Sequence, residues 1–340
     1  MLKRIIHPIY GVIVVLLFCI LIAFINYNDN SSPELTLTDN DNEYSLDEPY
    51  KYPVIPGMEE WDKLTNHEQK IEVCYVNPDL LSRMTTYALT ETVVTYPLFV
   101  DAVVYDSFEI GLDMLSKQFA GIDELLNRQD AYENLLLYIS KNQSLDNKEN
   151  IYVLNAKKLV KYFEEKGKNI NKSLTYYPTS VPTPNNSNVP VYVGFTWSDW
   201  NTDYNTEDVY NTYLSSAYNN VTELYPHSLN PAYNCHSYAW YQQSSNSVWM
   251  PDPSLYMSDG SYSASYPLSG RKITYTYTGS NTNTLEHSGV VSLVGSSPDS
   301  TYVTSKWGVH GLFYHRLTDC PYYHVEQQEV KTSISYWKLN

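Results

Sequence analysis

The chain has 340 residues, a hydrophobic fraction of 43% and a formal net charge of −16. Its length leaves room for about two domains, and its hydrophobic fraction is sufficient for packed cores. The acidity excludes nucleic acid as a partner, because phosphate binding needs clustered Lys and Arg, and no basic cluster follows the first four residues.

The first 27 residues carry a membrane-targeting pattern. Lys3 and Arg4 precede an uncharged apolar run from Ile9 to Ile25, close to the length that crosses a ~30 Å hydrocarbon layer. No small-residue cleavage site follows, so we expect an uncleaved signal-anchor transmembrane helix at 1–27 rather than a cleaved signal peptide. The positive flank predicts a single-pass protein of the cell membrane, with its N-terminus cytoplasmic and its body extracytoplasmic.

Two regions of different character follow the apolar run. Residues 28–53 are acidic and rich in Asn and Ser, which predicts a solvated tether. Residues 54–168 predict an all-α domain, in which Asn77 and Pro78 have the residue types of an N-cap and a first helical position. Because no nucleophile lies beside a base there, we expect this domain to have no catalytic role and Asp106 to lie on a solvated helix face.

The second half changes from helical to strand-like patterns. Residues 169–194 are rich in Pro, Asn and Ser, and we expect an extended linker there. Residues 195–340 predict a separate domain that acts without the helical one. Its strand signals are runs of β-branched and aromatic residues between turn formers, at 271–279, 288–295, 301–308 and 332–340.

Cys235 is the candidate nucleophile of the second domain. Asn234 can cap a helix that starts at Cys235, and a helix N-terminus lowers the pKa of a thiol. His287 stands at the start of an apolar strand, where an imidazole can activate the thiol. The next strand offers Ser305 to orient that imidazole, and His315 is the alternative third member.

This order of elements resembles papain-like cysteine peptidases and amidases of the NlpC and CHAP types. The NlpC type usually reads D-C-S-G around the nucleophile, whereas this chain reads Asn-Cys-His-Ser at 234–237. The similarity is greater to bacterial exported proteins that share an N-C-x-x-x-A-W core, a His strand, S-K-x-G and a late His. The matching residues here are Asn234, Cys235, Ala239, Trp240, His287, Ser305, Lys306, Gly308 and His315.

The resemblance implies a fold and an activity. The implied fold class is α+β, with a papain-like C-terminal domain that contains an antiparallel sheet. The implied activity is a thiol hydrolase that cleaves an amide bond in peptidoglycan stem peptides without a cofactor. We place Asn234, Trp249 and Lys306 at the substrate site, since Trp249 lies in a turn-rich loop and Lys306 can bind a carboxylate.

Other interpretations of these residues stay open. Outside the cell Cys235 can form a disulfide with Cys320, or it can be an inert core thiol. His287 can be a core histidine, and His236 is expected to be exposed on the next helical position. His310, His315, Cys320 and His324 are zinc-ligand types, but their spacing matches no closed zinc module, so we expect no metal.

A non-enzymatic function is the alternative to hydrolysis. The chain has 34 tyrosines, many of them in its second half beside Ser, Thr and Asn. Such a composition is typical of solvated strands and of surfaces that bind glycan or protein. The alternative hypothesis is therefore a surface protein whose tyrosine-rich C-terminal domain binds such a partner.

Overall fold

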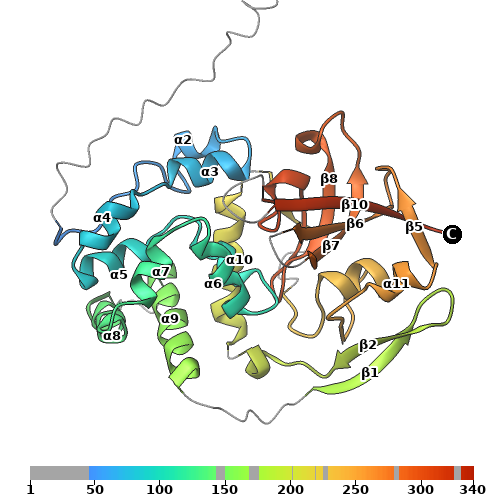
Figure 1. The fold of residues 1–340 in the computed structure, drawn as a ribbon, viewed down its shortest axis with the longest axis horizontal. Helices are drawn as coiled ribbons and strands as arrows, with labels where there is room; N and C mark the ends of the chain where they lie inside the picture. The colour runs from blue at the N-terminus through green and yellow to red at the C-terminus, as the bar shows by residue number, and fades with distance from the viewer. Residues whose placement is uncertain are drawn as a thin grey trace, which may run out of the picture. The chain divides into compact units, whose positions relative to one another are not determined.

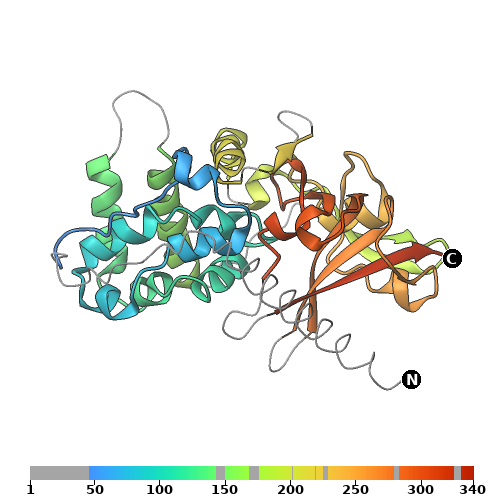
Figure 2. The same cartoon turned by 90° about the horizontal axis from the view of Figure 1, so that it is seen from above.

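The computed structural model describes residues 46–142, 150–167, 176–200, 202–218, 220–224, 229–278, 283–324 and 331–340. The chain divides into two units, and the one from Tyr44 to Asn340 contains all of these residues. Helices make up the first half of this unit, and two antiparallel sheets dominate its second half (Figures 1 and 2).

The first half, residues 46–167, is called the helical half below. Asn77 and Pro78 begin a helix as predicted, because the Asn77 side chain accepts a hydrogen bond from the Asp79 amide and Pro78 occupies the first turn. Its elements are α2 (Glu59–Asp62), α3 (His67–Val73), α4 (Pro78–Arg83), α5 (Thr86–Val94), η1 (Phe99–Val103), α6 (Phe108–Ser116), α7 (Gly121–Leu126), α8 (Ala131–Asn142) and α9 (Ile151–Gly167).

The second half is built around a seven-stranded antiparallel sheet. Its strand order is β3-β9-β8-β7-β6-β10-β5. The four runs predicted as strands are confirmed as β6, β7, β8 and β10. The strands are β3 (Thr222–Glu223), β5 (Tyr262–Ser265), β6 (Lys272–Thr278), β7 (Asn283–Leu293), β8 (Tyr302–Lys306), β9 (Leu312–Arg316) and β10 (Lys331–Leu339).

A smaller sheet begins inside the segment predicted as a linker. Strands β1 (Tyr177–Pro182) and β2 (Asn188–Val193) form an antiparallel hairpin, and β4 (Val248–Trp249) extends it. The prolines fit because β4 pairs only with Tyr192 and Val193, which leaves Pro190 without a strand on that side. The remaining elements are η2 (Trp197–Trp200), α10 (Tyr204–Ala217), η3 (Ser237–Tyr241), α11 (Leu255–Ser258), η4 (Pro298–Ser300) and η5 (Leu317–Asp319).

One hydrophobic core joins the helical half to the large sheet. Val103, Val104 and Met114 pack with buried residues of α10, β6 and β8 and with the fully buried Trp307, which follows β8. Trp61 of α2 donates its indole N–H to the carbonyl of Ala217, at 2.9 Å. The two halves therefore bury apolar surface against each other, which stabilises both.

The predicted fold class needs a correction at its membrane helix. Within the described ranges, no helix is long and apolar enough to span a bilayer. The helices found are short or amphipathic, and α9 contains several Lys and Glu residues. The fold is therefore α+β, with mixed helices and antiparallel sheets, and the transmembrane part of the prediction is wrong. The segment 1–27 itself, like most of the predicted tether, lies outside the described residues.

Candidate functional site

Asn234 caps the short helix that contains Cys235. Its Oδ1 accepts hydrogen bonds from the backbone N–H groups of Ser237 and Met250, both at 3.2 Å. Its Nδ2 donates to the carbonyl of Met250 at 2.9 Å and to Asp106 Oδ2 at 3.1 Å. The helix then continues as a π-helix from Ser237 to Tyr241. Asn234 is fully hydrogen-bonded, so it positions the helix start rather than offering a free amide to a substrate.

Cys235 lies where two strands of the large sheet separate. Strand β8 pairs with β7 from Val290 onward, so the N–H of Ser288 is not used by that strand. The backbone N–H groups of Ser288 and His236 lower the pKa of the Cys235 thiol, so both favour a thiolate. The thiol thus lies beside the part of β7 that β8 does not pair with.

The predicted lowering of the Cys235 pKa is wrong for this structure. Burial raises the pKa of the thiol well above its ordinary value, and the Asp106 carboxylate raises it further. These two effects exceed the opposing contribution of the two backbone N–H groups. Cys235 is therefore a neutral, fully buried thiol in the form described here.

His287 precedes Ser288 on β7 and has no hydrogen-bond partner. The described residues leave both of its ring nitrogens unpaired, although the side chain is fully buried. The ring stacks on Tyr322, with centroids 4.1 Å apart. Burial lowers the pKa of His287 well below its ordinary value, and His315 and His236 add to this effect. The imidazole is therefore neutral, and no hydrogen bond joins it to Cys235.

Ser305 and His315 bind each other rather than His287. Trp307 donates its indole N–H to Ser305 Oγ at 3.1 Å, and Ser305 Oγ lies 2.7 Å from His315 Nε2. His315 Nδ1 is 2.7 Å from the carbonyl of Arg316, so Nδ1 carries the hydrogen and Nε2 accepts from the serine. The two candidates for a third catalytic residue thus belong to one line of hydrogen bonds, which runs from Trp307 through Ser305 and His315 to the carbonyl of Arg316.

Lys306 and Trp249, like Asn234, are buried rather than open to a substrate. Lys306 donates to the carbonyls of Asn230 and Gly308, and its ammonium lies over the Tyr233 ring. Burial lowers the pKa of Lys306 to about 7. Trp249 is buried against Trp200, with ring centroids 4.3 Å apart. Lys306 faces the Cys235 region as a sequestered amine, and Trp249 is part of the small sheet's aromatic core.

His236 is buried, in contrast to the exposed position predicted for it. Its Nδ1 lies 2.8 Å from Ser288 Oγ, and burial lowers its pKa to about 4. Side chains alternate between the faces of a strand, so Ser288 and His287 point to opposite faces of β7. His236, which contacts the Ser288 side chain, and His287 therefore lie on opposite faces of β7, and of these two rings only His287 is unpaired within the described residues.

The sequence gives no indication that the helical half reaches this site. Residues 104–107, which we call the covering loop, connect η1 to α6 and lie against the Cys235 region. Asp106 accepts from Asn234, and the Tyr105 ring packs at a tilt against Tyr322, with centroids 4.4 Å apart. Burial raises the pKa of Asp106 to about 6, so the expectation of a solvated helix face was wrong.

The disulfide and metal interpretations can be compared with the described residues. Cys74, Cys235 and Cys320 are all free. His310 lies against Glu207, and His324 lies near the hydroxyls of Tyr105 and Tyr277, so the histidines of the proposed cluster have separate surroundings. Across the described ranges, no three His, Cys, Asp or Glu side chains converge as metal ligands would.

Comparisons with known proteins leave the assignment to the geometry of the site. No protein-family model, no curated protein and no solved structure matches this chain.

Proposed function

We propose that this chain is a thiol hydrolase that cleaves an amide bond, with Cys235 as nucleophile and His287 as proton carrier. The observation that supports it best is the position of Cys235 Sγ. The thiol responds to the backbone N–H of Ser288, which lowers its pKa, and Ser288 directly follows the unpaired, buried His287. A buried imidazole without a hydrogen bond costs stability, which a role in chemistry explains better than a role in packing.

The reaction follows from these groups. His287 takes the proton of the thiol, and the thiolate attacks the carbonyl carbon of the amide. The C–N bond then breaks while the imidazolium of His287 gives its proton to the leaving amine. A water attacks the resulting thioester, gives its proton to His287, and releases a carboxylic acid and the free thiol. The N–H groups of Ser288 and His236 lower the pKa of the thiol and thus favour negative charge at this position.

Turnover requires that the covering loop move away from the thiol. Cys235 is fully buried beneath contacts made by Tyr105 and Asp106. A substrate carbonyl reaches the sulfur only after these contacts open. The form described here is thus the closed state of the proposed enzyme.

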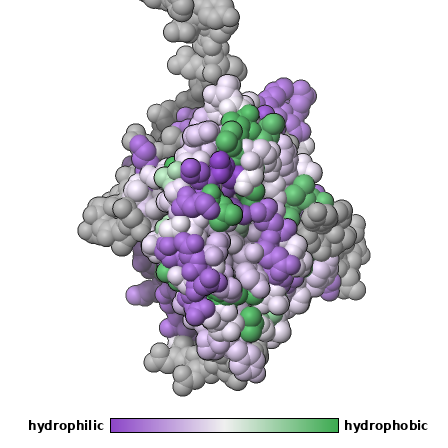
Figure 3. Space-filling model, turned by 90° about the vertical axis from the view of Figure 1, so that its right-hand side faces the viewer, coloured by the Kyte–Doolittle hydropathy of each residue, from purple (hydrophilic) through white to green (hydrophobic). Residues whose placement is uncertain are grey.

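The substrate class rests on the resemblance to papain-like cell-wall enzymes. We propose a peptide amide, with peptidoglycan stem peptides as the first substrate to examine. Figure 3 shows a mostly polar face at the sheet end, with apolar surface only in scattered spots. Over the described residues, this face therefore shows no large apolar patch on which a partner could dock.

The proposal is tested by digesting purified peptidoglycan with the full chain. Mass spectrometry of the released fragments should show cleaved amide bonds with the native chain and none with Cys235→Ser. Cys74→Ser is the matched control, because it removes another buried thiol and leaves Cys235 intact. A substrate-derived thioester on Cys235, trapped by rapid acidification, would identify the nucleophile directly.

Two outcomes would reject this function. Equal cleavage by native chain and Cys235→Ser would exclude Cys235 as nucleophile. Saturable binding of glycan or protein by both chains, without any cleavage, would favour the non-enzymatic surface protein instead.

A further inference from the structure

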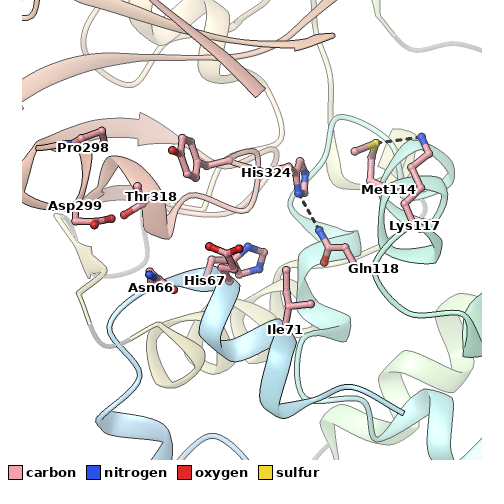
Figure 4. Close-up of a pocket in the computed structure, with 12 residues that line it drawn as sticks. Asn66, His67, Ile71, Met114, Lys117, Gln118, Pro298, Asp299, Thr318 and His324 are labelled. Atoms are coloured by element: carbon pink, nitrogen blue, oxygen red, sulfur yellow. Dashed lines mark hydrogen bonds between the residues drawn. The ribbon is translucent and has the colours of Figure 1, made fainter. Parts of the chain in front are cut away.

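A second site lies away from Cys235, in a cavity of about 200 Å³ between the helical half and the large sheet. Figure 4 shows three elements around it: α3 with His67 and Ile71, the end of α6 with Met114 and Gln118, and the η4–η5 region. The volume suits a molecule the size of a short aliphatic chain with one polar group.

The cavity wall contains two buried side-chain oxygens without hydrogen-bond partners in the described ranges. Thr318 is 6% exposed, and its hydroxyl oxygen is buried without a hydrogen bond. The side-chain oxygen of Gln118 is likewise buried and unpaired, since its amide nitrogen donates to His324 Nδ1 at 3.0 Å. Buried polar atoms are rarely left unpaired. The Gln118 oxygen can only accept and the Thr318 hydroxyl can accept, so a ligand that donates hydrogen bonds satisfies both.

Negative charge at the rim is also unmatched. Glu68 and Asp299 line the cavity as exposed carboxylates, and neither forms an ion pair within the described residues. Both carboxylates lie close enough to Tyr323 to affect its hydroxyl. Burial raises the pKa of Tyr323 most, and the negative charges of Asp299 and Glu68 raise it further. The rim therefore attracts positive charge.

The basic side chains near the cavity already have partners. Lys117 pairs with Asp113 at 2.8 Å, and His67 Nε2 lies 2.8 Å from Asp101 Oδ2. Burial lowers the pKa of His324 to about 3, so that ring is neutral. Arg316 influences Asp299, but it is not part of the wall and donates to the carbonyl of Thr65 at 2.9 Å.

From these contacts we propose that the cavity binds a primary organic ammonium ion with a short aliphatic stem. The ammonium donates hydrogen bonds to Thr318 and Gln118 and interacts with the carboxylates of Glu68 and Asp299. The stem lies against Ile71 and Met114, the apolar residues of the α3 and α6 walls. This site is independent of the thiol chemistry proposed for Cys235.

The test compares three probes of equal length and different charge: butylammonium, butan-1-ol and butyrate. NMR spectra of the full chain with labelled Ile and Met methyl groups report on Ile71 and Met114, which are assigned by Ile71→Val and Met114→Leu. Butylammonium should shift both signals saturably, with a Kd on the order of 1 mM, as suits a ligand of few atoms. Butan-1-ol should bind more weakly, and butyrate should not bind.

Variants assign the binding energy to named groups. Glu68→Gln and Asp299→Asn should each weaken butylammonium binding about three- to fivefold, the range of solvent-exposed ion pairs. Thr318→Val should weaken it while leaving the salt dependence unchanged. Glu72→Gln is the matched control, because it removes an exposed carboxylate from the same helix outside the cavity wall and should have no effect.

Three results would overturn the proposal. They are equal binding of butan-1-ol and butylammonium, binding of butyrate, and the absence of any saturable shift at Ile71 and Met114. Thermal unfolding of each variant shows whether a loss of binding reflects a loss of fold. Because no readout involves amide cleavage, failure here leaves the proposed hydrolase unaffected.

Discussion

Asn234 Nδ2 donates a hydrogen bond to Asp106 Oδ2 at 3.1 Å, which connects the cap of the Cys235 helix to the covering loop of the helical half. The other oxygen of Asp106 is buried without a partner. The Asp106 carboxylate thus has two effects. It holds Asn234, which positions the helix start at Cys235, and it raises the pKa of the Cys235 thiol. The state of Asp106 therefore influences both the stability of the closed form and the reactivity of Cys235.

Asp106→Asn should stabilise the protein at neutral pH. Burial raises the pKa of Asp106 to about 6, so its carboxyl supports the folded state while protonated. That contribution is complete below about pH 4 and is lost as the pH rises through 6. Urea unfolding from pH 4 to 7 should show the variant gaining about 1–3 kcal/mol over the native chain as the pH rises. Asp113→Asn, which changes an exposed carboxylate, is the control, and parallel curves for Asp106→Asn and native chain would contradict this.

Cys235 should react slowly with iodoacetamide in the native chain. The thiol is fully buried, and burial together with Asp106 raises its pKa. Labelling at pH 7, followed by peptide mass spectrometry, should be about 10²-fold slower than in urea-unfolded chain, because it depends on local opening. Asp106→Asn should speed the labelling by removing a negative charge beside the sulfur. Rapid labelling of native Cys235 at pH 6 would show that the site is open in solution.

His287→Phe should abolish amide cleavage without destabilising the fold. Phe keeps a planar ring against Tyr322 and removes two unpaired nitrogens from the interior. We expect the free energy of unfolding to stay the same or rise by about 1–2 kcal/mol. The matched control is His236→Phe, which breaks the bond to Ser288 and should cost about 1–3 kcal/mol. A large loss of stability in His287→Phe would indicate a structural histidine.

Lys158→Met should destabilise the junction between α9 and α10. Lys158 pairs with the buried Glu207 at 2.8 Å. Burial alone would raise the pKa of Glu207, but Lys158 and His310 lower it below its ordinary value. The pair therefore stabilises the fold above pH 4.5, and this is lost as the pH falls through the folded-state pKa.

The expected cost of Lys158→Met at pH 7 is about 2–4 kcal/mol, because the change leaves a buried carboxylate with less compensation. Urea unfolding gives this value, and adding Glu207→Gln to Lys158→Met should recover part of it. If the double variant were less stable than Lys158→Met, the loss would not come from the uncompensated charge.

The fragment 195–340 should not fold alone, contrary to what its sequence suggested. Its core includes Val103, Val104 and Met114 of the helical half. Without these residues, Trp307 and its neighbours are exposed to water. Circular dichroism of the fragment should show no cooperative unfolding, and adding residues 46–167 in trans should restore it. A cooperative transition of the fragment alone would show that the large sheet is an independent domain.

Sequence patterns predicted the local features of this fold well. The strands β6, β7, β8 and β10 have long runs of β-branched and aromatic residues, and Asn77–Pro78 is a strong helix start. The hairpin β1–β2 was missed because its prolines resemble those of a linker, although they occupy positions that need no N–H.

Long-range contacts could not be predicted from the sequence. The helix cap at Asn234 is local and was predicted, but the bond from Asn234 to Asp106 joins residues 128 positions apart. Ser305 and His315 satisfy each other's hydrogen bonds, which depends on the register of β8 with β9. The burial that raises the pKa of Cys235 likewise depends on the helical half. The sequence supplied the candidate residues of the site. Their protonation states could not be predicted, because these depend on burial by distant parts of the chain.

The covering loop has a consequence for the order in which a newly made chain matures. The Val104 carbonyl accepts from the hydroxyl of Tyr322, which lies 218 residues later in the sequence, and Gly308 approaches the same carbonyl so closely that a Cβ there would lie 2.7 Å from it. During synthesis the loop emerges long before either partner, and such distant contacts form late. Each molecule therefore passes through a stage in which its helices are made while the thiol is still uncovered.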